Sequence, residues 1–100
     1  MAIIFNVGLS DKDTHKQEIT TQDAIQLIAN LVGDCTIKTG NIGIFTHADG
    51  TRVIENSLEV VAYEMDKSTG EVIASELARQ LNQELICVTE QQLNTSFIGQ

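Results

Sequence analysis

The stretch THADGTRVIENSLEVVAYEM, residues 46–65, decides the fold of this chain. The segment His47-Ala48-Asp49-Gly50 has the composition of a tight turn, in which Gly50 can take a positive φ. Apolar residues recur at alternate positions after the turn, which is the period of a β-strand. Residues 35–44 alternate in the same way before it, with a change of phase at Gly40 that predicts a β-bulge. The two segments therefore predict a long hairpin.

The chain before the hairpin predicts a strand and then a helix. Residues 2–9 alternate apolar and small or polar side chains, as a strand does. Thr20 is placed to cap a helix, with Asp23 in its first turn. Apolar residues then share one helical face until Gly33, which is expected at the C-terminal cap.

The chain after the hairpin predicts a second helix and a last strand. Ser68 and Glu71 have the spacing of a capping box, so we expect the helix to begin there. Asn82 is expected to end it. Residues 85–89 form a final strand, which residues 93–98 either extend or follow with a short strand of their own.

This order of elements predicts an α+β, ferredoxin-like βαββαβ fold. Four antiparallel strands form one sheet in the order 4-1-3-2, and two right-handed crossovers place both helices on one face. A chain of 100 residues suits one domain, residues 1–100. Cys35 and Cys87 then lie on opposite edges, too far apart for a disulfide.

Charge and composition exclude several kinds of partner. The chain has 6 Lys and Arg against 14 Asp and Glu, a net charge of −8. Phosphate backbones need clustered cations, so we expect neither nucleic acid nor an anionic membrane surface as partner. An acidic surface attracts basic partners instead. The N-terminus has no signal-peptide pattern and the two cysteines make no disulfide framework, so the expected compartment is the cytoplasm.

Apolar side chains on the sheet face away from the helices predict self-association. Two helices cover only one face, whereas apolar residues point to both. We therefore expect a homo-oligomer, a dimer or higher, formed through this open face. The alternatives are a small face that is simply tolerated, or a C-terminal segment, residues 91–100, that folds across it. The expected interface residues are Ile4, Val61, Tyr63 and Met65.

Polar side chains gather around the hairpin and form the candidate ligand site. An Arg and a His there could meet a phosphate or carboxylate, which makes a small anionic ligand possible. The alternative is an exposed hairpin whose polar tip serves solubility. The candidate ligand-binding residues are Thr46, His47, Asp49, Arg52, Glu55 and Ser57.

No catalytic residue, metal ligand or cofactor is expected from the motifs. Cys35 and Cys87 lie in apolar surroundings and are interpreted as buried, inert thiols. No nucleophile elbow, P-loop or dinucleotide fingerprint occurs. His15 and His47, each near an Asp, could hold zinc only if their two loops met, and their spacing matches no metal signature.

Short pieces spread along the chain carry a family resemblance. The chain resembles ferredoxin-like small domains in plan, and loosely resembles a family of small uncharacterised bacterial proteins, some of them phage-borne. It lacks the Pro and Trp residues expected around the hairpin of that family. The resemblance implies the fold more than a function, and host cytoplasm if the gene is phage-borne. The matching pieces are Phe5, Gly8-Leu9, Thr36, Gly40, Gly50, Glu55, Ser57, Gln83-Glu84 and Phe97.

These observations favour a non-enzymatic cytosolic module that assembles through its open sheet face and holds a small ligand between subunits. One alternative is a phage-encoded inhibitor of host defence, which sequesters a nucleotide signal or blocks a basic protein surface. Another alternative is a small enzyme that uses the hairpin His47.

Overall fold

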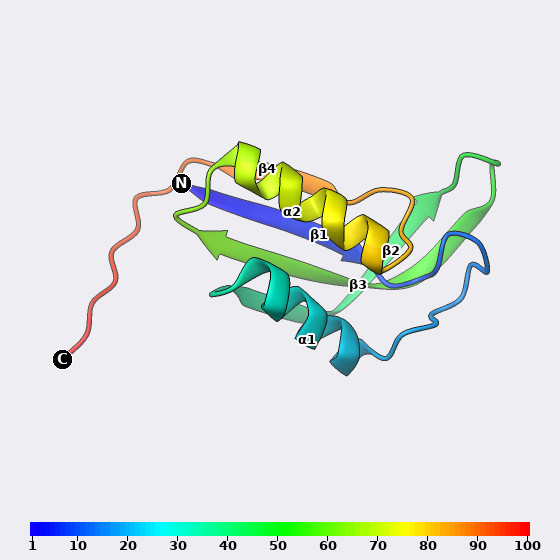
Figure 1. Cartoon of the computed structure of the whole chain (residues 1–100), viewed down its shortest axis with the longest axis horizontal. Coiled ribbons are helices and arrows are strands. Elements are labelled where there is room, and N and C mark those ends of the chain that lie inside the picture. Colours follow the sequence, from blue (N-terminus) through cyan, green and yellow to red (C-terminus); the bar gives the residue numbers. More distant parts are fainter.

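The computed structural model describes all residues, 1–100, and shows one four-stranded sheet with two helices. The helices lie on the same side of the sheet (Figure 1). Their order along the chain is the one that the sequence predicts. The elements are β1 (Ala2–Gly8), α1 (Thr21–Val32), β2 (Thr36–Thr46), β3 (Arg52–Tyr63), α2 (Lys67–Gln80) and β4 (Cys87–Gln91).

The sheet has the strand order β2-β3-β1-β4 with antiparallel neighbours. β1 lies in the interior, so Phe5 pairs with Val60 on one side and Val88 on the other. This arrangement confirms the ferredoxin-like fold and the predicted strand order. Cys35 and Cys87 lie at opposite edges and both are free thiols.

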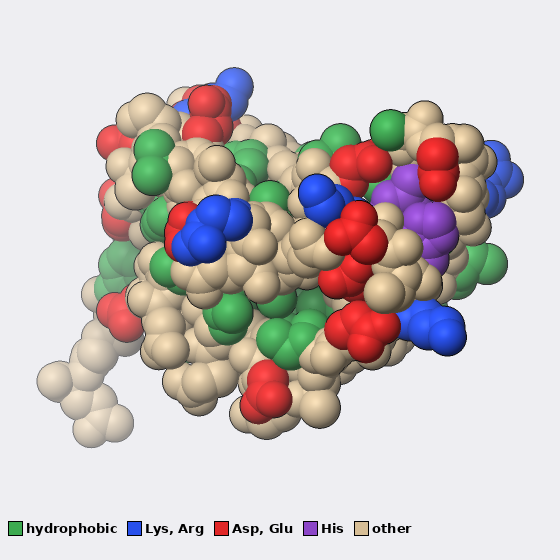
Figure 2. Space-filling model, turned by 45° about the vertical axis from the view of Figure 1, so that its right-hand side comes forward, with side chains coloured by type: hydrophobic (Ala, Val, Ile, Leu, Met, Phe, Trp, Pro, Cys, Tyr) green, Lys and Arg blue, Asp and Glu red, His purple; other side chains and the backbone are tan.

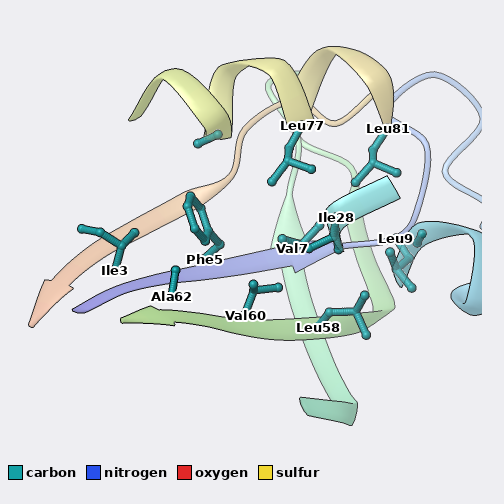
Figure 3. Close-up of a cluster of buried hydrophobic side chains, with 12 residues drawn as sticks. Ile3, Phe5, Val7, Leu9, Ile28, Leu58, Val60, Ala62, Leu77 and Leu81 are labelled. Carbon is teal, nitrogen blue, oxygen red and sulfur yellow. The ribbon is translucent and has the colours of Figure 1, made fainter. Parts of the chain in front are cut away.

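The core lies between the sheet and the helices (Figure 3). Alternate residues of β1 and β3 point to this side because successive side chains of a strand point to opposite faces. α2 contributes Leu77 and Leu81, and α1 contributes Ile28. Completely or almost completely buried members from the sheet and the segment after β1 are Ile3, Phe5, Val7, Leu9, Leu58, Val60 and Ala62.

Both helices have a side-chain N-cap, and the N-cap of the first helix is the residue that the sequence predicts. Thr20 accepts a hydrogen bond from the Asp23 amide at 3.1 Å, as the sequence predicts. The second helix begins earlier than predicted, because Asp66 and not Ser68 is its N-cap and accepts from the Thr69 amide at 2.7 Å. That hydrogen bond is the main reason why the pKa of Asp66 lies below its usual value.

The pairing of β2 with β3 continues past the end of β1 and forms a protruding arm (Figure 1). β1 ends at Gly8, opposite Ser57, whereas β3 pairs with β2 as far as Arg52. The predicted bulge is present, since the register shifts between Lys38 and Asn41. We call residues 41–57 the hairpin arm.

The C-terminal segment does not seal the open sheet face. β4 begins two residues later than predicted, and residues 93–98 form no strand. The tail leaves the sheet near the N-terminus (Figure 1) and meets it through Phe97, whose ring lies 6.2 Å from that of Tyr63. None of the helices has the length and apolar character needed to cross a membrane.

The packing of α2 on the sheet predicts a large effect of Leu77→Ala. Leu77 is fully buried, so its truncation leaves a cavity and is expected to lower the free energy of unfolding by about 2–5 kcal/mol. Val72→Ala, on the exposed side of the same helix, should change it by less than about 0.5 kcal/mol. Urea unfolding followed by circular dichroism measures both, and equal effects would contradict this account of the core.

Candidate functional site

A half-open hollow lies where β1 ends and the hairpin arm diverges from the α2–β4 loop. Its volume is about 200 Å³. The register places its strand residues, Ile44 excepted, on the face opposite the helices, because they alternate with the core residues. The lining residues are Asn6, Gly8, Gly43, Ile44, Phe45, Glu55, Ser57, Gln83, Leu85 and Cys87.

The Glu55 carboxylate lies directly over the last residue of β1. A Cβ atom on Gly8 would stand 1.7 Å from the Glu55 Oε1 atom. Only glycine leaves room for the carboxylate in this position, since any larger residue at Gly8 would displace it. The glycine at the end of β1 therefore allows the Glu55 carboxylate of β3 to occupy this position.

Hydrogen bonds to the chain after β1 hold the hollow together. The Ser10 amide donates to Glu55 Oε2 at 3.1 Å, and the Gln83 side chain donates to the Ser10 carbonyl oxygen at 2.6 Å. Ser10 itself is buried. Nearby, the Asn82 side chain donates to Asp11 at 2.9 Å, and this contact is the main reason for the lowered pKa of Asp11. The α2–β4 loop is thus tied to the end of β1.

The chemistry of the hollow is that of one carboxylate among neutral groups. Its lining contains no Lys, Arg or His. Ser57, Asn6 and Gln83 can donate or accept hydrogen bonds, and Leu85 and Phe45 supply apolar surface. A carboxylate in such a site binds a cation or accepts hydrogen bonds from hydroxyl groups, and it disfavours the small anionic ligand that the sequence suggested.

The structure brings together only two of the six candidate ligand residues. Glu55 and Ser57 share the hollow. Thr46 and Arg52 pair with each other at the far end of the arm, and alternation places them on its opposite face. Asp49 lies in the turn, where its carboxylate accepts from the Thr51 amide at 2.9 Å. This hydrogen bond is the main cause of the lowered pKa of Asp49.

His47, the sixth candidate, is buried next to the hollow and does not line it. Its ring stacks on that of His15 with centroids 4.5 Å apart, so the two histidine loops do meet (Figure 2). Glu84 Oε1 lies 3.7 Å from its Nδ1 atom, and Phe45 meets it edge-on. No group of three or more His, Cys, Asp and Glu side chains is arranged to hold a metal ion.

Three of the four predicted interface residues lie on the open sheet face. Ile4 pairs with Val61, and both are half-buried, whereas Tyr63 is 41% exposed. Met65 is a correction, because it packs against the core beneath the helices. The chain reverses the alternation at Glu64, which has a φ of 58°, and so turns Met65 to the other side. Self-association through this face stays a prediction.

The two cysteines differ in their surroundings, and one was interpreted wrongly. Cys35 is half-buried, and burial is the main reason for the raised pKa of its thiol. Cys87 is exposed and lines the hollow. Its apolar neighbours in sequence, Ile86 and Val88, point to the opposite face because they are one residue away in the strand.

The site residues that sequence reasoning missed are those of the hollow floor. Asn6, Gly8 and Gly43 were not proposed as site residues, nor were Gln83 and Leu85. A signal for the first three exists in the sequence: Asn6 is a polar residue in an apolar strand. The two glycines pair with polar residues of β3, Gly8 with Ser57 and Gly43 with Glu55. Only the fold shows that these signals meet.

The fold and the hollow define the chain as a small ferredoxin-like domain with a candidate ligand site at the end of its first strand. No protein-family model matches the chain. No curated protein matches it either. Two solved structures of a phage SAM lyase are similar to it in fold.

The similarity to these structures extends over most of the chain. The phage SAM lyase in complex with S-methyl-5'-thioadenosine has a TM-score of 0.72 and 21% identity, with 87% of this chain and 76% of that chain covered. The phage SAM lyase in the apo state has a TM-score of 0.58 and 19% identity, covering 87% and 75%. Both are small phage proteins, in keeping with the resemblance to phage-borne proteins.

This similarity corrects the main functional prediction. The sequence favoured a non-enzymatic binding or assembly module, but these two solved structures with a similar fold are of an enzyme. Among the expectations, that of a small enzyme is the closest to the finding. The sequence favoured a non-enzymatic module because it contains no recognisable catalytic motif.

The contact between Glu55 and Gly8 predicts the effect of Gly8→Ala. The added methyl group would push the flexible Glu55 carboxylate aside, and loss of its hydrogen bond to the Ser10 amide is expected to lower the free energy of unfolding by about 0.5–1.5 kcal/mol. The Ser10 amide should lose its hydrogen bond, which an upfield amide-proton shift and faster hydrogen exchange would report. Gly99→Ala, where a Cβ meets nothing within 4 Å, is the control. An unchanged Ser10 amide would contradict this geometry.

Proposed function

We propose that the hollow binds an adenosine thioether or sulfonium, and that the protein is a lyase acting on SAM. The observation that carries this proposal is the Glu55 carboxylate, held over Gly8 in a hollow without cations. The similarity to a lyase bound to S-methyl-5'-thioadenosine supports the ligand class. The proposed site residues are Glu55 and Ser57, with Asn6 and Gln83 as further polar groups.

Electrostatics favours a sulfonium substrate. SAM carries a permanent positive charge on its sulfur, whereas this chain carries a net charge of −8. An acidic surface raises the local concentration of a cation and speeds its encounter with the site. Within the hollow, Glu55 supplies a negative charge that no Lys, Arg or His of the lining offsets.

The proposed reaction breaks a carbon–sulfur bond. S-methyl-5'-thioadenosine is what remains of SAM when its 3-amino-3-carboxypropyl group leaves the sulfur. The electron pair of the broken bond goes to sulfur, which becomes a neutral thioether. The departing carbon fragment is completed by loss of a proton or by attack of its own carboxylate, so the step balances without water. A nearby carboxylate binds and positions the sulfonium before the bond breaks, and its attraction weakens as the sulfur becomes neutral.

A test of the function measures binding and turnover separately. Calorimetric titration with S-methyl-5'-thioadenosine is expected to show binding, and incubation with SAM should release the same thioether, detected by chromatography. Glu55→Gln keeps the shape of the side chain but removes its charge. Glu90→Gln is the matched control, because Glu90 is exposed on β4 and belongs to the other face of the sheet.

The two ligands also distinguish the role of Glu55. If the carboxylate binds the sulfonium charge, Glu55→Gln should weaken the binding of SAM at least tenfold and should change the binding of the neutral thioether little. If it binds ribose hydroxyls, both ligands should weaken together. Turnover should fall in either case, while Glu90→Gln remains unchanged. The proposal would be overturned if the unchanged protein neither bound the thioether nor consumed SAM.

We further propose that residues 1–100 act as one domain in the cytoplasm. A single continuous core, to which α1, α2, β1 and β3 all contribute, supports one folding unit. Two free thiols suit a reducing compartment. The proposed substrate, SAM, is also a metabolite of the cytoplasm.

A further inference from the structure

The outer part of the hairpin arm carries three exposed isoleucines on one face. Ile42, Ile44 and Ile54 are 66%, 67% and 71% exposed. Ile44 and Ile54 are directly paired across the two strands, and Ile42 is two residues along β2. They therefore form one apolar patch. We call this surface the isoleucine face, with Ile42, Ile44, Thr46, Arg52, Ile54 and Asn56 as its residues.

The isoleucine face is bare because the arm extends past its cover. The β3 residues of this face, Arg52, Ile54 and Asn56, lie on the same side of the strand as Leu58, which packs beneath the helices. The loop between β1 and α1 reaches Asn56, where the two side chains of Gln17 and Asn56 hydrogen-bond at 2.8 Å. Beyond Asn56 neither helix covers the arm (Figure 1). A β-branched apolar patch in this position is costly in water unless another surface covers it.

We propose that the occupant of the isoleucine face is a second copy of this chain. The first argument is charge. The face has no acidic residue although the chain has a net charge of −8, and Arg52 is its one charged group. Two acidic molecules repel each other over most of their surfaces, so they approach best where acids are absent.

The second argument is the edge of the sheet. β2 is an edge strand of 11 residues without proline, so its outer backbone groups lack a neighbouring strand. The bulge between Lys38 and Asn41 interrupts this edge, but residues 41–46 continue it along the arm with no further bulge. A stable interface removes about 800 Å² of surface per partner, more than three side chains supply. The isoleucine face and the adjoining β2 edge together offer a continuous surface for it.

Self-association at the arm also bears on the hollow. Ile44 lines the hollow as well as the isoleucine face. At about 200 Å³ the hollow is smaller than the roughly 300–1,000 Å³ of ordinary small-molecule sites. A second copy seated on the arm would add the missing wall. This part of the inference rests on the proposed function, whereas the self-association does not.

Light scattering after gel filtration, without ligand and over a range of concentrations, tests the association. The unchanged protein is expected to be oligomeric. Ile54→Lys should raise the dissociation constant at least tenfold, because it buries a charge in the contact. Val72→Lys, on the exposed side of α2, is the matched control and should leave the oligomer unchanged. Circular dichroism verifies the fold, and Ile42→Lys is the second variant if Ile54→Lys does not fold.

Each outcome decides between the parts of the inference. A monomeric unchanged protein, or an oligomer that Tyr63→Lys dissociates and Ile54→Lys does not, would overturn the isoleucine face as the contact. If monomeric Ile54→Lys binds S-methyl-5'-thioadenosine as tightly as the unchanged protein, the shared hollow is wrong while the proposed function stands. If the oligomer forms but binds no thioether, the proposed function fails and the self-association stands.

Discussion

The unequal lengths of neighbouring strands are the constraint on which the rest of the structure depends. β1 pairs with β3 over seven residues and with β4 over five and then ends, whereas β2 and β3 stay paired beyond it. Where the three strands run together, one face is covered by helices and forms the core. Where β1 has ended, the same hairpin runs on without cover. The hollow lies at the boundary between these two regions.

This boundary places a charged group where a small domain can hold it. Glu55 lies over the backbone of Gly8 and accepts a hydrogen bond from Ser10, so the carboxylate has a fixed position without a buried ion pair. Burying an isolated charge is expensive, and a half-open hollow keeps that cost low. The arrangement leaves the negative charge available to a ligand.

Several parts of the fold could be predicted because local and periodic signals agreed. Thr20 caps the first helix as its spacing indicates, and the bulge lies at the phase change in β2. The prediction for Met65 was wrong because one residue of positive φ, Glu64, reverses the alternation, and no local pattern announces it. The prediction that Cys87 is buried was wrong for a related reason. Apolar neighbours in a strand point to the opposite face and do not indicate the burial of the residue between them.

The sequence by itself determined the elements, their order, the two-layer plan and the acidity of the surface, since periodicity and charge are properties of neighbouring residues. The tertiary structure alone decided which polar groups meet. It placed the Glu55 carboxylate over Gly8 and stacked His15 on His47. It also placed Arg52 on the face of the arm opposite Glu55. These contacts join segments tens of residues apart, and their geometry depends on where each strand ends and how the sheet packs. A sequence pattern carries neither quantity.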